Sequence, residues 1–304
     1  MNDIAVLMCI YKEDLSLVEL SVLSTLDSIS EFEYEFNIII DNPKLSGEVK
    51  SFLEKIKSSH KGINLYFNCI NIGLAKSLNI GLKLCNSKYI MRMDADDICL
   101  PERAKLQFEF MEQNKQVGLV GGSVQRIDET GSFIGVSSSN QCDSTVLQKK
   151  YWRYKSICFH PTWFVRREVF DSFNYNNLVC AQDVELLFRL LENGIIIKNI
   201  NENLILYRVN PNSLSLNKGY EQSLIRYFLN KTYKHKSNFP LLEKKINKKL
   251  NQRISFVKYL FNKFHYRYSD AITRKNKLTL FIFSAVSPLH AYKTYLLFMS
   301  KKIK

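Results

Sequence analysis

Residues 88–97 read Lys-Tyr-Ile-Met-Arg-Met-Asp-Ala-Asp-Asp, a mainly apolar run that ends in three aspartates. The run up to Met93 is typical of a buried strand, and the aspartates follow where such a strand leaves the core. Carboxylates this close to one another repel, and a cation that joins them removes the repulsion. Because oxygen ligands favour Mg²⁺ or Mn²⁺ over Zn²⁺, the stretch predicts a strand followed by a metal site.

A second interpretation of the same aspartates needs no metal. Asp97 lies shortly before Pro101, which is a favourable first residue for a helix. Acidic side chains stabilise helix N-termini, so Asp97 is also a candidate N-cap.

The chain around this stretch alternates short β-branched runs with amphipathic stretches, which is typical of a parallel sheet with crossover helices. We therefore expect an α/β fold of the nucleotide-binding type. The expected strands are 4–10, 36–40, 63–67, 88–93, 117–122, 160–165 and 204–209, and the expected helices are 15–29, 48–58, 74–84, 102–114 and 182–192. The polar segment 137–143 is expected to be a mobile connection.

Polar side chains follow three of these strands. They are Tyr11 and Glu13 after the first strand, Asp41 after the second, and the aspartates from Asp94 after the fourth. Ligands of open α/β sheets bind outside the carboxyl ends of the strands. These side chains are therefore predicted to line one cleft.

Length and composition set further limits. With 304 residues and 46% hydrophobic content, the chain can bury one large domain, or one domain and a smaller appendage. Its seven cysteines are scattered singly, which argues against a disulfide framework or a structural zinc site and for a reducing compartment. The first apolar run follows no basic segment, so it reads as a strand and not as a signal peptide, and a cytoplasmic location is expected.

The net charge of +14 is concentrated at the C-terminal end. Residues 234–304 carry 17 Lys or Arg against Glu243 and Asp270, while residues 1–233 carry 26 basic and 27 acidic groups. Apolar residues at three- and four-residue spacing over 242–261 predict a basic amphipathic helix, suited to an anionic membrane surface. The apolar segment 278–299 is interrupted by Pro288 and Lys293, which favours an interfacial segment over a spanning helix.

The composition of this basic region is also compatible with two other interpretations. One is a solvated helix that closes over the rest of the protein. The other is nucleic-acid binding, which we do not expect because no recognised binding motif accompanies the charge.

Several blocks of the sequence resemble the family 2 glycosyltransferases of the GT-A fold, which build bacterial polysaccharides. The blocks occur in the family's order at 71–81, 88–97, 100–103, 160–162 and 181–190. The resemblance covers about residues 1–215. It implies a GT-A catalytic domain over 1–215, with a nucleotide-sugar-binding half (1–115) and an acceptor half (116–215), followed by a basic helical region (216–304).

The resemblance implies roles for the first half of the chain. Asp41 corresponds to the aspartate that holds the nucleoside, although Asn42 stands where the family has Asp or Gly. Asp94 is placed near the ribose, and Asp96 on Mn²⁺ or Mg²⁺. The nucleotide-sugar donor is also expected to meet Tyr11 and Glu13. Lys76 and Arg92 are candidates for the diphosphate, and each also reads as a solvated surface charge.

In the acceptor half, the resemblance implies that Asp183 is the general base. An acceptor hydroxyl must lose its proton as it attacks the sugar, and a carboxylate does this work. Gln182 replaces the family's Glu, and His160 is placed in the acceptor pocket. Asp183 also reads as an N-cap carboxylate and His160 as a buried, hydrogen-bonded histidine. Asn210 stands where the family often has a histidine, so a weaker metal site is expected.

These residues predict an inverting glycosyltransferase, because one base is present without a carboxylate placed as a nucleophile. The expected reaction transfers a hexose from a uridine diphosphate sugar to a saccharide, carried on a lipid pyrophosphate, in O-antigen or capsule synthesis at the inner face of the cell membrane. Two alternatives are a sugar-nucleotide pyrophosphorylase and a non-catalytic membrane-associated module that retains the fold.

Overall fold

The computed structural model describes residues 2–139, 157–210 and 219–235. The chain divides into two compact units. Of the described residues, the first unit contains 2–139, 157–177 and 186–209, and the second contains 178–185, 210 and 219–235.

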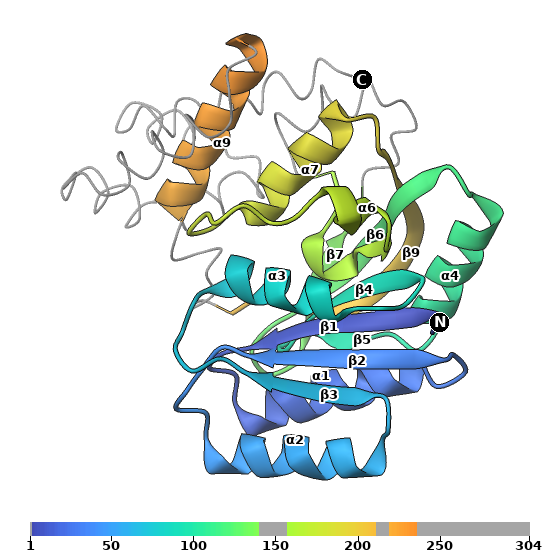
Figure 1. Ribbon diagram of the computed structural model, residues 1–304, viewed down its shortest axis with the longest axis vertical. Coiled ribbons are helices and arrows are strands. Elements are labelled where there is room, and N and C mark those ends of the chain that lie inside the picture. The colour runs from blue at the N-terminus through green and yellow to red at the C-terminus, as the bar shows by residue number, and fades with distance from the viewer. Residues whose placement is uncertain (1, 140–156, 211–218, 236–304) are drawn as a thin grey trace. The chain divides into compact units, whose positions relative to one another are not determined.

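One mixed sheet forms the centre of the first unit (Figure 1). Its strands in the described residues are β1 (Ile4–Ile10), β2 (Tyr34–Ile40), β3 (Ile63–Phe67), β4 (Tyr89–Asp94), β5 (Ile98–Cys99), β6 (Val117–Ile127), β7 (Phe133–Ser137), β8 (Phe164–Arg166) and β9 (Ile196–Arg208). The order is β3-β2-β1-β4-β8-β6-β9-β5, with β7 paired to β6. Strands β3, β2, β1 and β4 pair in parallel, as do β6 and β9, whereas β8 runs antiparallel to both its neighbours. The predicted α/β class is confirmed.

Helices cover both faces of the parallel half of the sheet. These helices are α1 (Leu15–Ser28), α2 (Gly47–Ser59) and α3 (Leu74–Leu84), and α1 and α2 lie on the face opposite to α3 (Figure 1). Val6 and Met8 of β1 belong to the same buried cluster as Val18 and Val22 of α1. Burial on both faces explains why β1 is apolar throughout and does not alternate with polar residues.

Helix α3 approaches the sheet closely at Gly81. A Cβ atom added to Gly81 would lie 2.1 Å from Cδ1 of Leu7 in β1. The absence of a side chain therefore lets α3 pack directly against the strand that leads to the predicted site.

Three expected elements differ from those observed. The strand expected over 160–165 is only β8, because His160–Thr162 forms a 3₁₀ helix and Pro161 lacks the N–H that a sheet ladder requires. The strands expected at 117–122 and 204–209 are parts of the longer β6 and β9. The hairpin strand β7 was not predicted. Only its last residue, Ser137, falls in the connection expected to be mobile over 137–143, of which residues 140–143 lie outside the described residues.

Two further helices of the first unit follow the carboxylate stretch and β8. They are α4 (Arg103–Gln113) and the short α6 (Val169–Ser172). Glu102 occupies the N-cap position of α4. The helix expected over 102–114 is thus confirmed, with Pro101 in the turn that precedes it.

Helix α7 (Gln182–Glu192) has its first turn in the second unit and its remainder in the first, and α9 (Gly219–His235) belongs to the second unit. The amphipathic segment 242–261 and the apolar segment 278–299 lie outside the described residues. Within the described part of the chain, no helix is both long and apolar enough to span a bilayer.

Candidate active site

The site lies where the strand order changes direction. Strands β2 and β3 follow β1 on one side, whereas β4 pairs with its other side. Such switch points open a crevice at the carboxyl ends of the strands. Tyr11 and Glu13 follow the end of β1, and Cys9 of β1 is the register partner of Asp94 at the end of β4. Two groups that are 80 residues apart in sequence are thereby brought to one edge of the sheet.

Four acidic side chains interact at this edge, and we call Glu13, Asp94, Asp96 and Asp97 the carboxylate cluster. Burial, followed by the charges of Asp94 and Glu13, raises the pKa of Asp96 to about 7. Burial also raises the pKa of Glu13, although the backbone N–H groups of Tyr11 and Lys12 donate hydrogen bonds to its carboxylate at 2.6 and 3.0 Å. These carboxyl groups therefore lie close enough for the charge of one to raise the pKa of another, as the sequence predicted for the aspartates.

Asp97 does not cap a helix, so that interpretation is wrong. Its Oδ1 accepts a hydrogen bond of 2.8 Å from the backbone N–H of Arg208, the last residue of β9. Its Oδ2 is buried and has no hydrogen-bond partner among the residues that the structure describes. Burial and the charges of Asp96 and Asp94 raise the pKa of Asp97 well above the ordinary value. The short strand β5, which pairs with β9, explains why Asp97 faces the end of β9.

Arg92 is 3% exposed, so the interpretation as a solvated surface charge is wrong for this residue. Its guanidinium donates hydrogen bonds to the carbonyl oxygens of Leu7 and Met93 and forms an ion pair with Asp94. Lys76, by contrast, is exposed on the first turn of α3. The diphosphate contacts expected of both residues stay predictions.

Asp41 is buried at the end of β2 and holds the loop that leads into α3. Its carboxylate accepts hydrogen bonds of 2.9 Å from Asn68 Nδ2 and Ile72 N, and one of 2.8 Å from Gly73 N. The side chain of Asn42 bridges the neighbouring loop, donating to Tyr11 O at 2.6 Å and accepting from Lys44 N at 2.9 Å. These contacts give Asn42 a local role that a glycine would not provide.

His160 is a partly buried, hydrogen-bonded histidine. Its Nε2 lies 2.8 Å from the hydroxyl of Tyr175, and its ring makes an edge contact with Trp163. Burial, together with the charge of Arg92, moves the pKa of His160 well below the ordinary value. The imidazole is therefore neutral at pH 7, and its assignment to an acceptor pocket stays a prediction.

Gln182 and Asp183 lie in the second unit. Asp183 is the second residue of α7, inside its first turn and not at the N-cap position. Ala181, which precedes the helix, has φ 56°, a left-handed conformation that is uncommon for a residue with a Cβ. The role of Asp183 as general base stays a prediction.

A cavity of about 570 Å³ adjoins the end of β1. It lies between the N-terminal ends of α1 and α2, and Tyr11, Glu13 and Asn42 are among its lining residues. Its other charged lining residues are Lys12 and Lys44 on the basic side and Asp14, Glu19 and Glu48 on the acidic side, so carboxylates outnumber lysines around this cavity.

Residues 5–173 match the family model described as glycosyl transferase family 2. This match spans more than half of the chain. The protein belongs to glycosyl transferase family 2. The predicted resemblance is confirmed, and the protein is a transferase enzyme of this family.

Three other glycosyltransferases are similar in sequence to this family 2 glycosyltransferase. An uncharacterized glycosyltransferase of Methanocaldococcus jannaschii is 28% identical over 238 residues, which are 78% of this chain and 81% of the relative. The O-antigen biosynthesis glycosyltransferase WbnJ of Escherichia coli is 28% identical over 74% of this chain and 84% of its own. An Escherichia coli UDP-Gal:alpha-D-GlcNAc-diphosphoundecaprenol beta-1,3-galactosyltransferase is 27% identical over 66% of this chain and 72% of its own.

The crystal structure of Staphylococcus aureus TarS residues 1–349 has a similar fold. The TM-score is 0.56 with 15% sequence identity, over 99% of this chain and 88% of that chain. At this identity the likeness concerns the fold alone. The similar fold confirms the GT-A architecture that was predicted for this family 2 glycosyltransferase.

The carboxylate cluster has the chemistry of a divalent-cation site. Burial and the charges of Asp94 and Glu13 raise the pKa of Asp96 to about 7. A bound cation would offset the repulsion between these carboxylates. Within the described residues, no group of three or more His, Cys, Asp or Glu side chains is arranged to hold an ion alone. Mg²⁺ sites commonly use one or two carboxylates, water and substrate phosphates. The residues present fit an ion that is shared with a phosphorylated ligand.

Two residues of the transferase site were missed by sequence reasoning. Arg208 holds the cluster from β9, and Asn68 links Asp41 to Ser77 of α3 through hydrogen bonds of 2.9 and 3.0 Å. The local signal for Arg208 was a charged residue directly after the apolar run 204–207. No local pattern marked Asn68, because its partners are distant in sequence.

Proposed function

We propose that the protein transfers a hexose from a uridine diphosphate sugar to a saccharide acceptor carried on a lipid pyrophosphate, with inversion, during synthesis of a surface polysaccharide. The observation that carries this proposal is the carboxylate cluster at the switch point of the sheet, which fits a cation shared with a diphosphate. The printed names of two Escherichia coli relatives support the substrate classes, one naming O-antigen biosynthesis and one a UDP-sugar and a diphosphoundecaprenol acceptor.

The donor's nucleoside is proposed to occupy the cavity beside the end of β1. Tyr11 offers an aromatic ring to a base, and its backbone position is fixed by the bond to Asn42. Asp41 shapes this region by holding the loop before α3, and Asp94 is proposed to accept a hydrogen bond from the ribose. Lys76 remains a candidate for the diphosphate, since it is exposed at the start of α3.

Asp96 is proposed to hold Mn²⁺ or Mg²⁺ through its carboxylate. When bound, such an ion supplies positive charge that stabilises the departing nucleoside diphosphate. Asp97, fixed by Arg208, is proposed to keep the loop that carries Asp96 in place. Asn210 replaces the histidine common in the family, so the protein's own ligand set is expected to be small.

Asp183 is proposed to remove the proton from the acceptor hydroxyl as that oxygen attacks the anomeric carbon. The glycosidic bond to the diphosphate breaks as the new bond forms, and the proton passes to the Asp183 carboxylate. Displacement from the opposite side converts an α-linked donor into a β-linked product. Gln182 and His160 are proposed to contact the acceptor saccharide.

A lipid-linked acceptor requires access to a membrane surface. We propose that the basic region beyond Lys234 binds anionic lipids, which would place the enzyme at the inner face of the cell membrane. Sedimentation of the full chain with anionic vesicles should exceed sedimentation with neutral vesicles. Equal sedimentation with both, or no change when residues 236–304 are deleted, would contradict membrane binding.

Membership of family 2 favours transfer over the pyrophosphorylase reaction and over a non-catalytic module. The test is nucleotide release from a panel of nucleotide sugars in the presence of Mn²⁺, with and without a lipid-pyrophosphate-linked saccharide. Release that depends on both the acceptor and a uridine diphosphate sugar is expected. An α-linked product from an α-linked donor would contradict inversion.

A single substitution tests the assignment of Asp183 as the general base. Asp183→Asn should abolish transfer while uridine diphosphate binding persists, because the amide cannot accept the proton. Asp171→Asn is the control, since Asp171 lies in the first turn of α6 and pairs with Arg167 on the surface. Full turnover in Asp183→Asn would refute the assignment.

A further inference from the structure

We infer that Arg92 is a positioning residue that fixes the carboxylate of Asp94, and that it does not contact the donor itself. This inference rests on the proposed function, in which Asp94 meets the ribose of the nucleotide. It replaces the diphosphate contact that the sequence suggested for Arg92.

The two partners differ in accessibility. The Arg92 side chain is 4% exposed, whereas the Asp94 side chain with which it forms an ion pair is 30% exposed. A ligand in the crevice therefore reaches the aspartate and not the guanidinium. The guanidinium is also occupied, because Nη1 donates to the carbonyl oxygens of Leu7 and Met93, and Nη2 donates to Asp94 Oδ1.

A buried guanidinium stays charged and must be paired within the protein. Its Nε is buried and has no hydrogen-bond partner in the described part of the chain, so Arg92 depends more strongly on the ion pair that Nη2 forms with Asp94. Asp94 is the carboxylate with which Arg92 forms an ion pair. The need of Arg92 for a partner thus holds Asp94 in one orientation.

Asp94 is fixed on its other sides as well. Its backbone oxygen accepts a hydrogen bond of 2.8 Å from Ser21 Oγ of α1, and its register with Cys9 anchors it to β1. Oδ1 contacts Arg92, and the Asp94 side chain is 30% exposed, so Oδ2 is the carboxylate oxygen that does not face the guanidinium. The geometry leaves this one oxygen for a ligand hydroxyl.

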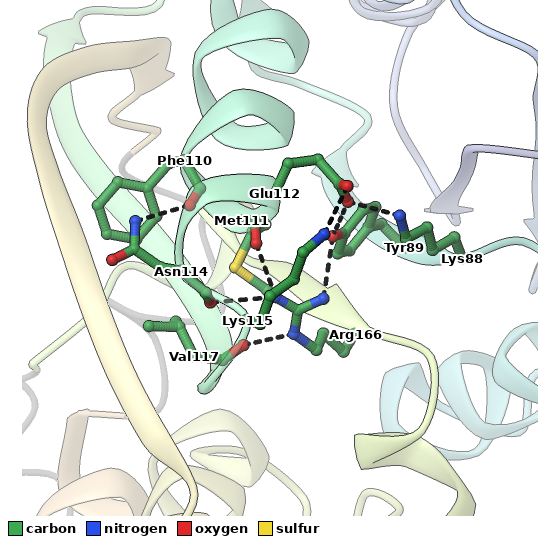
Figure 2. A network of polar contacts seen from close by, with 9 residues as sticks. All are labelled: Lys88, Tyr89, Phe110, Met111, Glu112, Asn114, Lys115, Val117 and Arg166. Atoms are coloured by element: carbon green, nitrogen blue, oxygen red, sulfur yellow. Dashed lines mark hydrogen bonds and ion pairs between the residues drawn. The ribbon is translucent and has the colours of Figure 1, made fainter.

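Arg166 of β8 provides a matched control, because it is another buried arginine in a strand that pairs with β4 (Figure 2). Its guanidinium contacts neutral groups instead of a carboxylate. These groups are the backbone oxygens of Val117 at 2.7 Å, Met111 at 2.7 Å and Asn114 at 3.1 Å, and the hydroxyl of Tyr89 at 3.0 Å. Loss of Arg166 should weaken the fold without touching the carboxylate cluster.

The test is a double-mutant cycle on the full chain, with the dissociation constant of uridine diphosphate measured by titration calorimetry in the presence of Mn²⁺. Arg92→Met should weaken binding about tenfold, the value of one lost charge-assisted hydrogen bond. In an Asp94→Asn background the same substitution should change binding less than about twofold, because its effect passes through Asp94. Additive losses would overturn the inference, since they would mean that Arg92 contacts the nucleotide independently.

Two further variants separate positioning from loss of fold. Arg92→Lys keeps a cation that can reach Asp94, so it should retain binding within about threefold of wild type. Arg166→Met should lower the midpoint of thermal unfolding and leave uridine diphosphate binding unchanged. If Arg166→Met weakens binding as much as Arg92→Met, the inference is wrong.

The results also separate failure of this inference from failure of the proposed function. Wild-type protein that binds no nucleotide would contradict the proposed function. Wild-type protein that binds nucleotide, with additive losses in the double mutant, would contradict this inference alone.

Discussion

The backbone N–H of Arg208 donates a hydrogen bond of 2.8 Å to the carboxylate of Asp97, across 111 residues of sequence. The guanidinium of Arg208 donates further hydrogen bonds. Its Nε donates to the backbone oxygen of Asp96 at 3.0 Å, and its Nη1 donates to the backbone oxygens of Asp128 and Glu129, both at 3.1 Å. One residue at the end of β9 therefore fixes both the cluster's loop and the turn between β6 and β7. It lies beyond residues 5–173, the part of the chain that matches the family model.

Arg208→Met should lower the free energy of unfolding by about 3 kcal/mol, because it removes a buried positive charge beside the carboxylate cluster and takes the side-chain donor from three backbone carbonyl groups. Urea denaturation measures the change. Arg126→Met, which alters a partly buried arginine on the neighbouring strand β6, should cost less than about 1 kcal/mol. Equal midpoints for wild type and Arg208→Met would show that the loop is held by other contacts.

The affinity for Mn²⁺ should depend on pH through Asp96. Because the pKa of Asp96 is raised to about 7, the folded protein binds a proton that the unfolded chain releases near pH 4. Protonated Asp96 therefore stabilises the fold at low pH, and this contribution is lost as pH rises from about 4 through 7. A cation must displace the same proton, so Mn²⁺ affinity should increase about tenfold per pH unit below pH 7 and level off above it.

Titration calorimetry with Mn²⁺ at pH 5.5 to 8 measures this dependence. Asp96→Asn should bind weakly at every pH, whereas Asp27→Asn, on the exposed surface of α1, should follow the wild-type curve. A flat wild-type curve between pH 5.5 and 7 would contradict the assignment of Asp96.

The parallel half of the fold was predictable because its strands are short, apolar and buried on both faces. The strand β7 was missed for the opposite reason. Phe133, Ile134 and Val136 of this edge strand are exposed, with Phe133 at 64%, so the usual alternation of buried and solvated residues is absent. Pro161 shows a second limit, since the run that includes it has strand-like composition but lacks a ladder donor.

For the site, local sequence located Asp94, Asp96 and Asp41 because each follows a strand that is itself recognisable. The contacts that hold them were not predictable, since Ser21, Asn68 and Arg208 reach them from other elements. The burial of Arg92 had a local signal in its position within an apolar strand. Its pairing with Asp94, two residues away, became evident only from the side-chain geometry.

Asp41→Ala should destabilise the protein by about 2 kcal/mol, because the backbone N–H of Ile72 loses its acceptor and that of Gly73 keeps only Asn71 Oδ1 at 3.0 Å. The loop before α3 should also become mobile. Hydrogen exchange at Ile72 and Gly73 measures that change directly, and exchange at Val49 of α2 provides the unaffected reference. Unchanged exchange at both positions would mean that the loop is held without Asp41.

Glu112 of α4 should make stability depend on pH between about 4.5 and 2. Its carboxylate accepts hydrogen bonds from Lys115 at 2.7 Å, Lys88 at 2.6 Å and the hydroxyl of Tyr89 (Figure 2). The contacts with Lys115, then Lys88 and Tyr89, lower the pKa of Glu112 to about 2. Since this value lies below the ordinary one, the contribution of Glu112 to stability is present above about pH 4.5 and is lost as pH falls toward 2.

Glu112→Gln should therefore lower the free energy of unfolding by about 1 kcal/mol at pH 7, a value reduced for solvent screening, and by progressively less below pH 4.5. Urea denaturation at pH 7, 4.5 and 3 measures the difference, and Glu54→Gln, which removes an exposed partner of Lys50 at 4.0 Å, should show almost none. A constant difference at all three pH values would show that Glu112 contributes by packing and not by charge.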